Sequence, residues 1–181
     1  MCWDPAAESA ELDHPVRDYG MTNLVGGCAC GNIRYECSEG PIVQLICHCR
    51  DCQRASGSAF AAIMMLPVDK FRFLKEEPAY FEVTGGSGRQ LRRGFCSKCG
   101  SPISAHWPAV NAIQMIQVSS LDDPSIFEPQ TECWVSSGHP WHSLSPNTAK
   151  FDERPLSGVK DRFDAYFATR NAGQPRGHSG R

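Results

Sequence analysis

The sequence predicts a mainly β fold of short strands, and three observations support this fold class. Nine short segments with β character are separated by turn signals such as EGP, TGGSG and DDPS. Only one other segment has the spacing of an amphipathic helix. The chain has 181 residues, of which 41% are hydrophobic and 21% charged, as is typical of one globular domain with its own core.

The predicted strands cover most of the chain. In AIQMIQV, apolar and polar residues alternate in part, and Ile113, Met115 and Ile116 compete for the inward face, so we expect a half-buried strand. The other segments are bounded by glycine, proline, aspartate or serine, as short strands usually are. In chain order the predicted strands are 32–37, 43–47, 58–66, 70–74, 79–83, 90–96, 102–107, 112–118 and 131–135.

The segment SGVKDRFDAYFATRN is the one with helical spacing. Val159, Phe163, Tyr166 and Phe167 fall on a single stripe of such a helix. Short helices gain most of their stability from packing an apolar face. The pattern therefore predicts a C-terminal helix packed on the body of the domain.

The two ends of the chain differ in composition from the part between them. The first 22 residues are polar and acidic, and the last residues, NAGQPRGHSGR, are polar and basic. We therefore predict a flexible lead over 1–22, the domain itself over 23–155, and a helix with a flexible basic tail over 156–181.

Charge and hydropathy argue against several classes of partner. A net charge of -2 gives no reason to expect nucleic acid. No apolar run approaches the roughly 20 residues of a membrane-spanning helix. The N-terminus has no apolar signal region, so we expect a cytoplasmic protein. In that reducing compartment the 10 cysteines favour metal or catalytic roles over disulfides.

Two pairs of cysteines predict a closed, structural metal site. Cys28 and Cys30 form a C-x-C motif, and Cys96 and Cys99 form a C-x-x-C motif. A glycine follows each pair, and it allows the tight turn in which backbone amides point at thiolate sulfur. Together the pairs supply four thiolates, the usual ligand set of structural zinc.

Three further cysteines, Cys47, Cys49 and Cys52, lie within one tight loop and predict an open zinc site. Structural zinc sites have four protein ligands, whereas catalytic sites keep three and leave one position for substrate. His48 lies between two of the proposed ligands and should point away from the metal. Residues that could still close the site from elsewhere in the sequence are Cys37, Cys133, His106, His139 and His142.

The segments GGCACGNIRY, CHCRDCQRASGSAF, GFCSKCGSPI and WVSSGHPWHSL with the later FDERP carry a family resemblance. They resemble the glutathione-dependent formaldehyde-activating enzyme (GFA) family, which is also related to centromere protein V. The resemblance runs from about Leu24 to Pro155. It implies a β-tent of small antiparallel sheets pinned by structural zinc.

The resemblance also implies two zinc ions per chain and a reaction. The family's structural ligands match Cys28, Cys30, Cys96 and Cys99, and its catalytic zinc ligands match Cys47, Cys49 and Cys52. The family's named activity is the condensation of formaldehyde with glutathione to S-hydroxymethylglutathione, which is classed as a carbon–sulfur lyase reaction. The expected partners are therefore a small-molecule thiol, with glutathione as cosubstrate, and an aldehyde.

Residues next to the three-cysteine loop are candidates for binding this substrate. Arg50 and Arg54 flank the loop and could bind the carboxylates of glutathione. Loop amides or hydroxyls of Ser56, Gly57 and Ser58 could polarise the aldehyde, although a capped turn explains the serines equally well. Further candidate cations are Arg34, Arg89, Arg92, Arg93 and Lys98.

A second interpretation is a binding module in which both zinc ions are inert. The fourth position at the three-cysteine site distinguishes the two, because exchangeable water or thiol indicates an enzyme and a protein ligand indicates a module. Cys2, Cys37 and Cys133 lie outside the shared cysteine clusters and are predicted to be free thiols. The tryptophans Trp107, Trp134 and Trp141 are predicted to serve packing.

Overall fold

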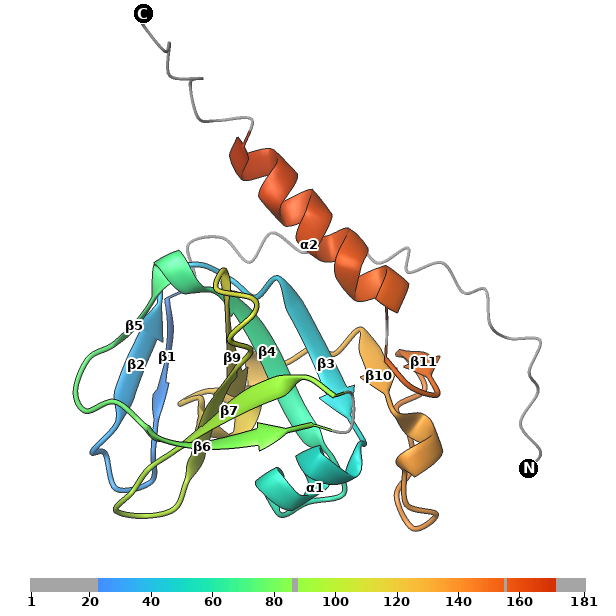
Figure 1. The fold of residues 1–181 in the computed structure, drawn as a ribbon, viewed down its shortest axis with the longest axis horizontal. Helices are drawn as coiled ribbons and strands as arrows, with labels where there is room; N and C mark the ends of the chain where they lie inside the picture. Colours follow the sequence, from blue (N-terminus) through green and yellow to red (C-terminus); the bar gives the residue numbers. More distant parts are fainter. Residues whose placement is uncertain (1–22, 86–87, 155, 172–181) are drawn as a thin grey trace, which may run out of the picture.

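The computed structural model describes residues 23–85, 88–154 and 156–171 (Figure 1). The predicted N-terminal lead, the basic tail and Cys2 lie outside the described residues. Within the described part, the predicted mainly β class is confirmed, with strands forming two sheets and a helix near the C-terminal end. No helix in these ranges is long and apolar enough to cross a membrane.

Three strands form a small antiparallel sheet in the order β1-β2-β5. Eight strands form a larger sheet in the order β11-β10-β3-β4-β9-β8-β7-β6. The bounds are β1 (Leu24–Gly27), β2 (Arg34–Cys37), β3 (Val43–Cys47), β4 (Ala61–Pro67), β5 (Phe71–Phe73), β6 (Ala79–Thr84), β7 (Gln90–Phe95), β8 (Pro102–His106), β9 (Ile113–Gln117), β10 (Thr131–Cys133) and β11 (Ala149–Phe151).

The larger sheet is mixed rather than wholly antiparallel. β10 pairs in parallel with β3 on one side and with β11 on the other, while the remaining pairs are antiparallel. A parallel pair needs a long connection. Here the chain between β3 and β10 makes most of the larger sheet, so β10 brings a distant segment beside the three-cysteine motif.

One apolar core lies between the two sheets, and a second lies on the opposite face of the larger sheet. The first contains Tyr35 and Ile33 from the β1–β2 hairpin packed against Met64, Leu66 and Ile116 of the larger sheet. The two helices α1 (Arg50–Ser56) and α2 (Leu156–Asn171) contribute to the second core. Both faces of the central strands are therefore covered.

This double coverage corrects the prediction for the strand around Met115. All five residues of β9 are buried, whereas a half-buried strand was expected. Gln114 is accommodated because its amide donates to the carbonyls of Ala105 and Met115, at 3.3 and 3.0 Å. A buried amide with two acceptors avoids the cost of an unpaired polar group.

The C-terminal helix α2 packs as its apolar stripe predicted. Val159, Phe163, Tyr166 and Phe167 contact the second core, next to β3. Arg170 in its last turn lies 3.1 Å from a carboxylate oxygen of Glu39, which ties the end of the helix to the loop after β2.

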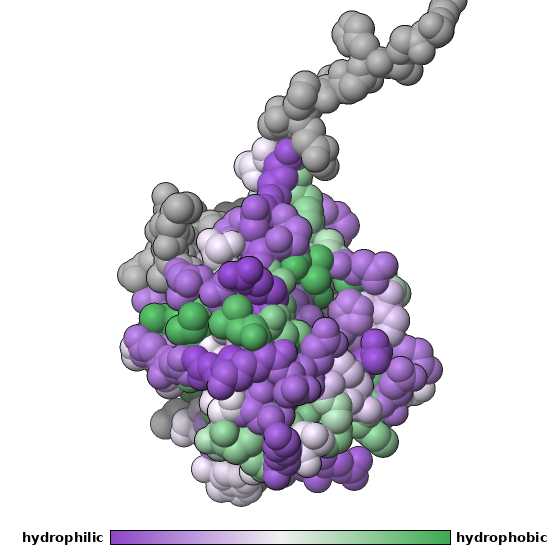
Figure 2. All heavy atoms as spheres, turned by 90° about the vertical axis from the view of Figure 1, so that its left-hand side faces the viewer, coloured by the Kyte–Doolittle hydropathy of each residue, from purple (hydrophilic) through white to green (hydrophobic). Residues whose placement is uncertain are grey.

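The surface shows no extended apolar face on the side seen in Figure 2. Hydrophilic side chains cover most of that view, and apolar side chains form a limited band between them. Exposed large apolar residues among those described are Val68, Leu74, Phe81, Phe95 and Trp141. The exposure of Trp141, at 71%, contradicts its predicted packing role, whereas Trp107 and Trp134 are partly buried against the second core.

Candidate metal centres

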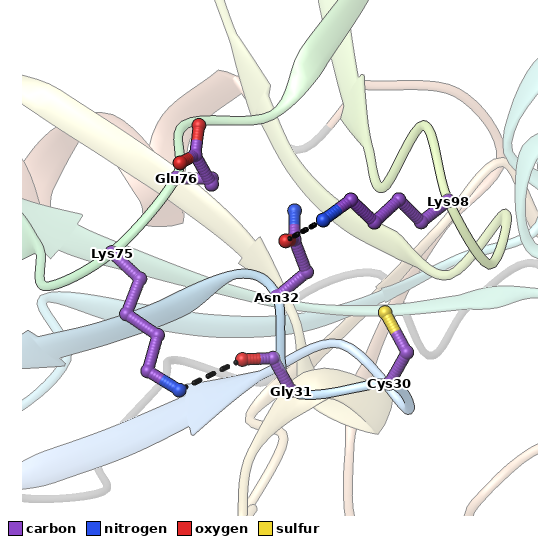
Figure 3. A pocket seen from close by; sticks show the side chains of 6 residues that line it. All are labelled: Cys30, Gly31, Asn32, Lys75, Glu76 and Lys98. Atoms are coloured by element: carbon purple, nitrogen blue, oxygen red, sulfur yellow. Dashed lines mark hydrogen bonds between the residues drawn. The ribbon is translucent and has the colours of Figure 1, made fainter.

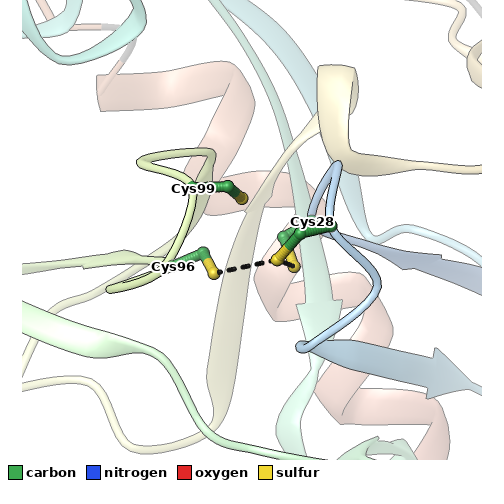
Figure 4. Close-up of side chains that lie close together, drawn as sticks. Cys28, Cys96 and Cys99 are labelled. Atoms are coloured by element: carbon green, nitrogen blue, oxygen red, sulfur yellow. Dashed lines mark hydrogen bonds between the residues drawn. The ribbon is translucent and has the colours of Figure 1, made fainter.

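The four cysteines of the first cluster meet at two facing turns. Cys28 and Cys30 lie in the turn between β1 and β2, and Cys96 and Cys99 lie in the turn between β7 and β8 (Figure 4). Their sulfur atoms all lie within 4.8 Å of one another. The cluster therefore ties the small sheet to the larger one.

The sulfur spacing in this cluster fits a tetrahedral metal ion. Four sulfurs bound at about 2.3 Å lie about 3.8 Å apart. The Cys28–Cys30 and Cys30–Cys96 sulfur distances are 3.5 and 3.8 Å. The predicted glycine turns are confirmed as well, since Gly31 and Gly100 have φ angles of 71° and 75°. Only glycine adopts this conformation at little cost.

Hydrogen bonds to sulfur prepare the cluster for a cation. The N–H of Ile33 donates to Cys28 Sγ at 3.2 Å. The hydroxyl and the backbone N–H of Ser101 lower the pKa of Cys99 to about 5. The same hydroxyl oxygen accepts from the N–H of Ala29 at 3.2 Å, so Ser101 connects the two turns. Thiolate is the form that binds metal, and these contacts favour it.

A cavity of about 590 Å³ opens beside this cluster and is drawn in Figure 3. Lys75 donates to the carbonyl of Gly31 at 3.1 Å, and Lys98 donates to the side-chain oxygen of Asn32. Both lysines thus hold the turn that carries Cys30. We interpret the cavity as the rim of a closed site, because its two cations already have partners.

The three cysteines of the second cluster, Cys47, Cys49 and Cys52, lie at the junction of β3 and α1. Their sulfur atoms also lie within 4.8 Å of one another. Cys49 is the N-cap of α1, and its sulfur accepts from the N–H of Cys52 at 3.4 Å. The sequence predicted a loop here rather than a helix, since seven residues are too few to show a helical period.

The three sulfurs differ in exposure and in acidity. Cys47 and Cys52 are buried, whereas Cys49 is half-buried, so the accessible side of the cluster is at Cys49. Contacts from the other two thiols lower the pKa of Cys49 to about 2. Cys133 and Cys49 raise the pKa of Cys47. A cation bound by the three sulfurs would favour the thiolate form of all three.

Cys133 lies closer to this cluster than its place in the sequence indicated. It is in register with Cys47 across the parallel pair of β10 and β3, and both are buried. Its contact with Cys47 is a main cause of the raised pKa of the Cys47 thiol. Neither Cys133 nor any of the other proposed fourth ligands joins the mutual 4.8 Å group among the described residues.

His48 and Glu132 form a buried pair next to the cluster, and this pair was not predicted from the sequence. His48 Nε2 and a Glu132 carboxylate oxygen are 2.7 Å apart, and both side chains are almost completely buried. His48 points away from the cysteines, as predicted. An acidic residue inside the apolar segment TECWV was the available signal, because buried carboxylates need partners.

Gln53 connects α1 to the segment after β10. Its amide donates to the carbonyls of His48 and Ser137, at 2.7 and 3.0 Å. Its oxygen accepts from Arg50 and from His139, the latter at 3.0 Å. All hydrogen-bonding atoms of this buried side chain are thus used, and they fix the helix that carries Cys52.

We predict that Gln53→Leu lowers the affinity of the three-cysteine site for a divalent metal about 10- to 100-fold, as the loss of outer-shell partners does elsewhere. Leucine is similar in size but leaves the carbonyls of His48 and Ser137 unpaired. Competition with a chromophoric chelator measures the affinity. Gln90→Leu, at the exposed first residue of β7, is the control. Equal affinities in the two variants would contradict the role of Gln53.

The predicted substrate-binding residues lie along α1 and its C-terminal turn. Arg50 and Arg54 are exposed on the helix. The Ser56 hydroxyl donates to Phe60 O at 2.7 Å and accepts from Ser58 N at 3.3 Å. Gly57 caps the helix with a φ of 67°. The serine hydroxyl and two loop amides are therefore engaged in the turn, and the binding roles of these five residues stay predictions.

Fold and site together define a mainly β protein with two cysteine clusters able to hold metal ions. The family model described as glutathione-dependent formaldehyde-activating enzyme matches residues 23–137, more than half of the chain, and the chain belongs to this family.

Solved structures include one that resembles this chain, a crystal structure of a Rhodobacter sphaeroides protein. It shares 15% sequence identity, with a TM-score of 0.43 over 70% of this chain and 98% of that chain. A comparison with curated protein sequences gave no match.

Proposed function

We propose that the protein is a zinc-dependent enzyme of the carbon–sulfur lyase type that acts on a thiol–aldehyde adduct. Glutathione and formaldehyde, giving S-hydroxymethylglutathione, are the substrates that the family description favours. The observation that carries this proposal is the contrast between the two clusters. One has four mutually close sulfurs, while the other has three.

The donor sets support zinc at both sites. Cysteine thiolates are soft ligands that select zinc over magnesium or calcium. The four-cysteine cluster has the ligands of a structural site, and the three-cysteine cluster has those of a site with an open position. When bound to three thiolates, zinc would supply a cationic position that favours the thiolate form of a substrate thiol.

The chain itself would position the reactants. The net reaction forms a bond between the thiol sulfur and the aldehyde carbon, and the thiol proton ends on the aldehyde oxygen. Among the donors of the turn after α1, the hydroxyl of Ser58 has no hydrogen bond to a described residue, unlike that of Ser56. We therefore assign polarisation of the aldehyde to Ser58, and binding of a carboxylate to the exposed Arg50 and Arg54.

A non-catalytic, zinc-stabilised binding module is the alternative, and the position of Cys133 favours it. A thiol in contact with Cys47 could become a fourth ligand if the strand β10 shifted towards α1. A closed four-thiolate site would then have no position for a substrate thiol.

Native mass spectrometry of protein purified under reducing conditions distinguishes the two functions. We expect two zinc ions per chain and, after addition of glutathione, an adduct that Cys49→Ser abolishes. Cys37→Ser, at a buried cysteine outside both clusters, should keep both zinc ions and the adduct. Two zinc ions without an adduct, and no acceleration of S-hydroxymethylglutathione formation, would overturn the proposal of an enzyme and favour the binding module.

A further inference from the structure

A second cavity, of about 260 Å³, lies between α1 and the strands β6 to β9. In Figure 1, α1 lies below β6 and β7. One wall is Ala55 of α1, and another is the turn around Gly100 of the four-cysteine cluster. The cavity therefore lies between the two metal centres. Its lining residues are Ala55, Phe81, Arg93, Gly94, Phe95, Gly100, Pro102, Ser104 and Gln117.

The strand register places Arg93 on the same face of the larger sheet as Cys47. Arg93 pairs with Ala105, which pairs with Met115. Met115 pairs with Met65, and Met65 with a residue four positions before Cys47. Paired residues share a face, and so do residues an even number apart on one strand. Because α1 covers this face, the curled sheet brings Arg93 towards the helix that carries Cys52.

The chemistry of the cavity fits an organic anion. Arg93 is half-buried and forms no ion pair or hydrogen bond with a described residue. Its cross-strand partner Phe81 is 62% exposed, although large aromatic side chains are usually buried. Phe95 forms a second apolar wall. A cation without a described partner in a cavity that two accessible aromatic residues also line is suited to a carboxylate attached to an apolar or peptide chain.

Arg92, the neighbour of Arg93, forms an ion pair and a ring contact within the same hairpin. Its Nε is 3.2 Å from Glu82, and its guanidinium lies over the ring of Tyr80, 4.5 Å from the centroid. Successive residues of a strand point to opposite faces, so Arg92 lies on the other face of the sheet from Arg93, and it is not among the residues that line the cavity. It is the natural control for Arg93.

Size and reach indicate which part of a substrate would fit. Sites that bury a whole drug-sized ligand measure about 300–1,000 Å³, so this cavity suits one arm of a peptide. Ala55 lies three residues after Cys52, and residues so spaced on a helix have Cβ atoms about 5–6 Å apart. An extended peptide covers about 7 Å in two residues, which is more than the spacing between Cys52 and the cavity wall at Ala55.

We propose that this cavity binds a carboxylate-bearing arm of the thiol substrate, with Arg93 as the carboxylate ligand and Phe81 and Phe95 as the walls. This inference rests on the proposed function and adds specificity to it. Thiols that carry a carboxylate on a residue joined to the one with the sulfur, as glutathione does, would be selected over small uncharged thiols such as 2-mercaptoethanol.

Binding of S-methylglutathione to the zinc-loaded full chain, followed by NMR titration, tests the cavity separately from the metal site. Its methylated sulfur cannot form a thiolate. We expect binding that Arg93→Ala weakens about 10- to 100-fold, that Arg93→Lys partly restores, and that Arg92→Ala leaves within about twofold. Phe81→Ala should weaken it as well.

Two results would overturn the cavity proposal. One is the absence of S-methylglutathione binding to the wild-type chain, and the other is equal binding by the Arg93→Ala and Arg92→Ala variants. The failure of the proposed function has a different signature, namely the absence of a glutathione adduct at Cys49. Binding of S-methylglutathione that depends on Arg93 would then still support the cavity.

Discussion

Replacing Cys96 with serine is expected to unfold the domain under conditions in which the wild-type chain is folded. Cys96 is fully buried and lies 3.8 Å from the sulfur of Cys30, across the junction of the two sheets. Zinc bound by four thiolates contributes about 10–16 kcal/mol in small zinc domains. The whole free energy of unfolding of a domain is about 5–15 kcal/mol. Loss of one thiolate should therefore remove most of the stability.

Far-UV circular dichroism on heating, combined with zinc determination, measures this effect. The Cys96→Ser variant should bind fewer than two zinc ions and lose most of its cooperative transition. Cys37→Ser is the matched control, because Cys37 is equally buried and its thiol donates to Glu39 O at 3.2 Å. It should keep both zinc ions and lose about 1–3 kcal/mol. If the two variants melt alike with two zinc ions each, the four-cysteine cluster is not a structural zinc site.

The cysteine clusters could be predicted from the sequence because each turn is local. Two cysteines and a glycine within four or five residues determine how their backbone can turn, and no distant segment is needed. Grouping the C-x-C pair with the C-x-x-C pair required only the ligand count of zinc. The structure then brought Cys28 and Cys96 together from turns of different sheets.

Features created by strand pairing could not be predicted in this way. Cys133 and Glu132 reach Cys47 and His48 because β10 pairs in parallel with β3, and register depends on the whole sheet. The same limit explains the error for β9. Its polar residues indicated a solvent-facing side, but the small sheet and the helices cover both faces.

Replacing Glu132 with alanine should destabilise the domain by about 3–5 kcal/mol, as the loss of one partner in a buried pair does. The Glu132 carboxylate accepts from the N–H of Ser145 and from the hydroxyl of Thr148, both at 2.7 Å, and contacts His48 Nε2 at the same distance. Alanine leaves the buried Nε2 of His48 and the N–H of Ser145 without this acceptor, while the hydroxyl of Thr148 keeps the carbonyl of Ser145. Urea unfolding measures the loss in stability, and zinc determination shows whether the nearby three-cysteine site survives.

Glu132→Gln separates hydrogen bonding from charge at this position. A glutamine oxygen can still accept from Ser145 and Thr148, and its amide can donate to His48 Nε2 if the ring proton moves to Nδ1, which has no partner among the described residues. We expect this variant to lose about 1–2 kcal/mol. A loss of stability below about 1 kcal/mol in Glu132→Ala would contradict the role of Glu132 in holding β10 in place. If Glu132→Gln is as unstable as the alanine variant, the carboxylate charge, rather than the number of satisfied partners, holds β10 against the three-cysteine site.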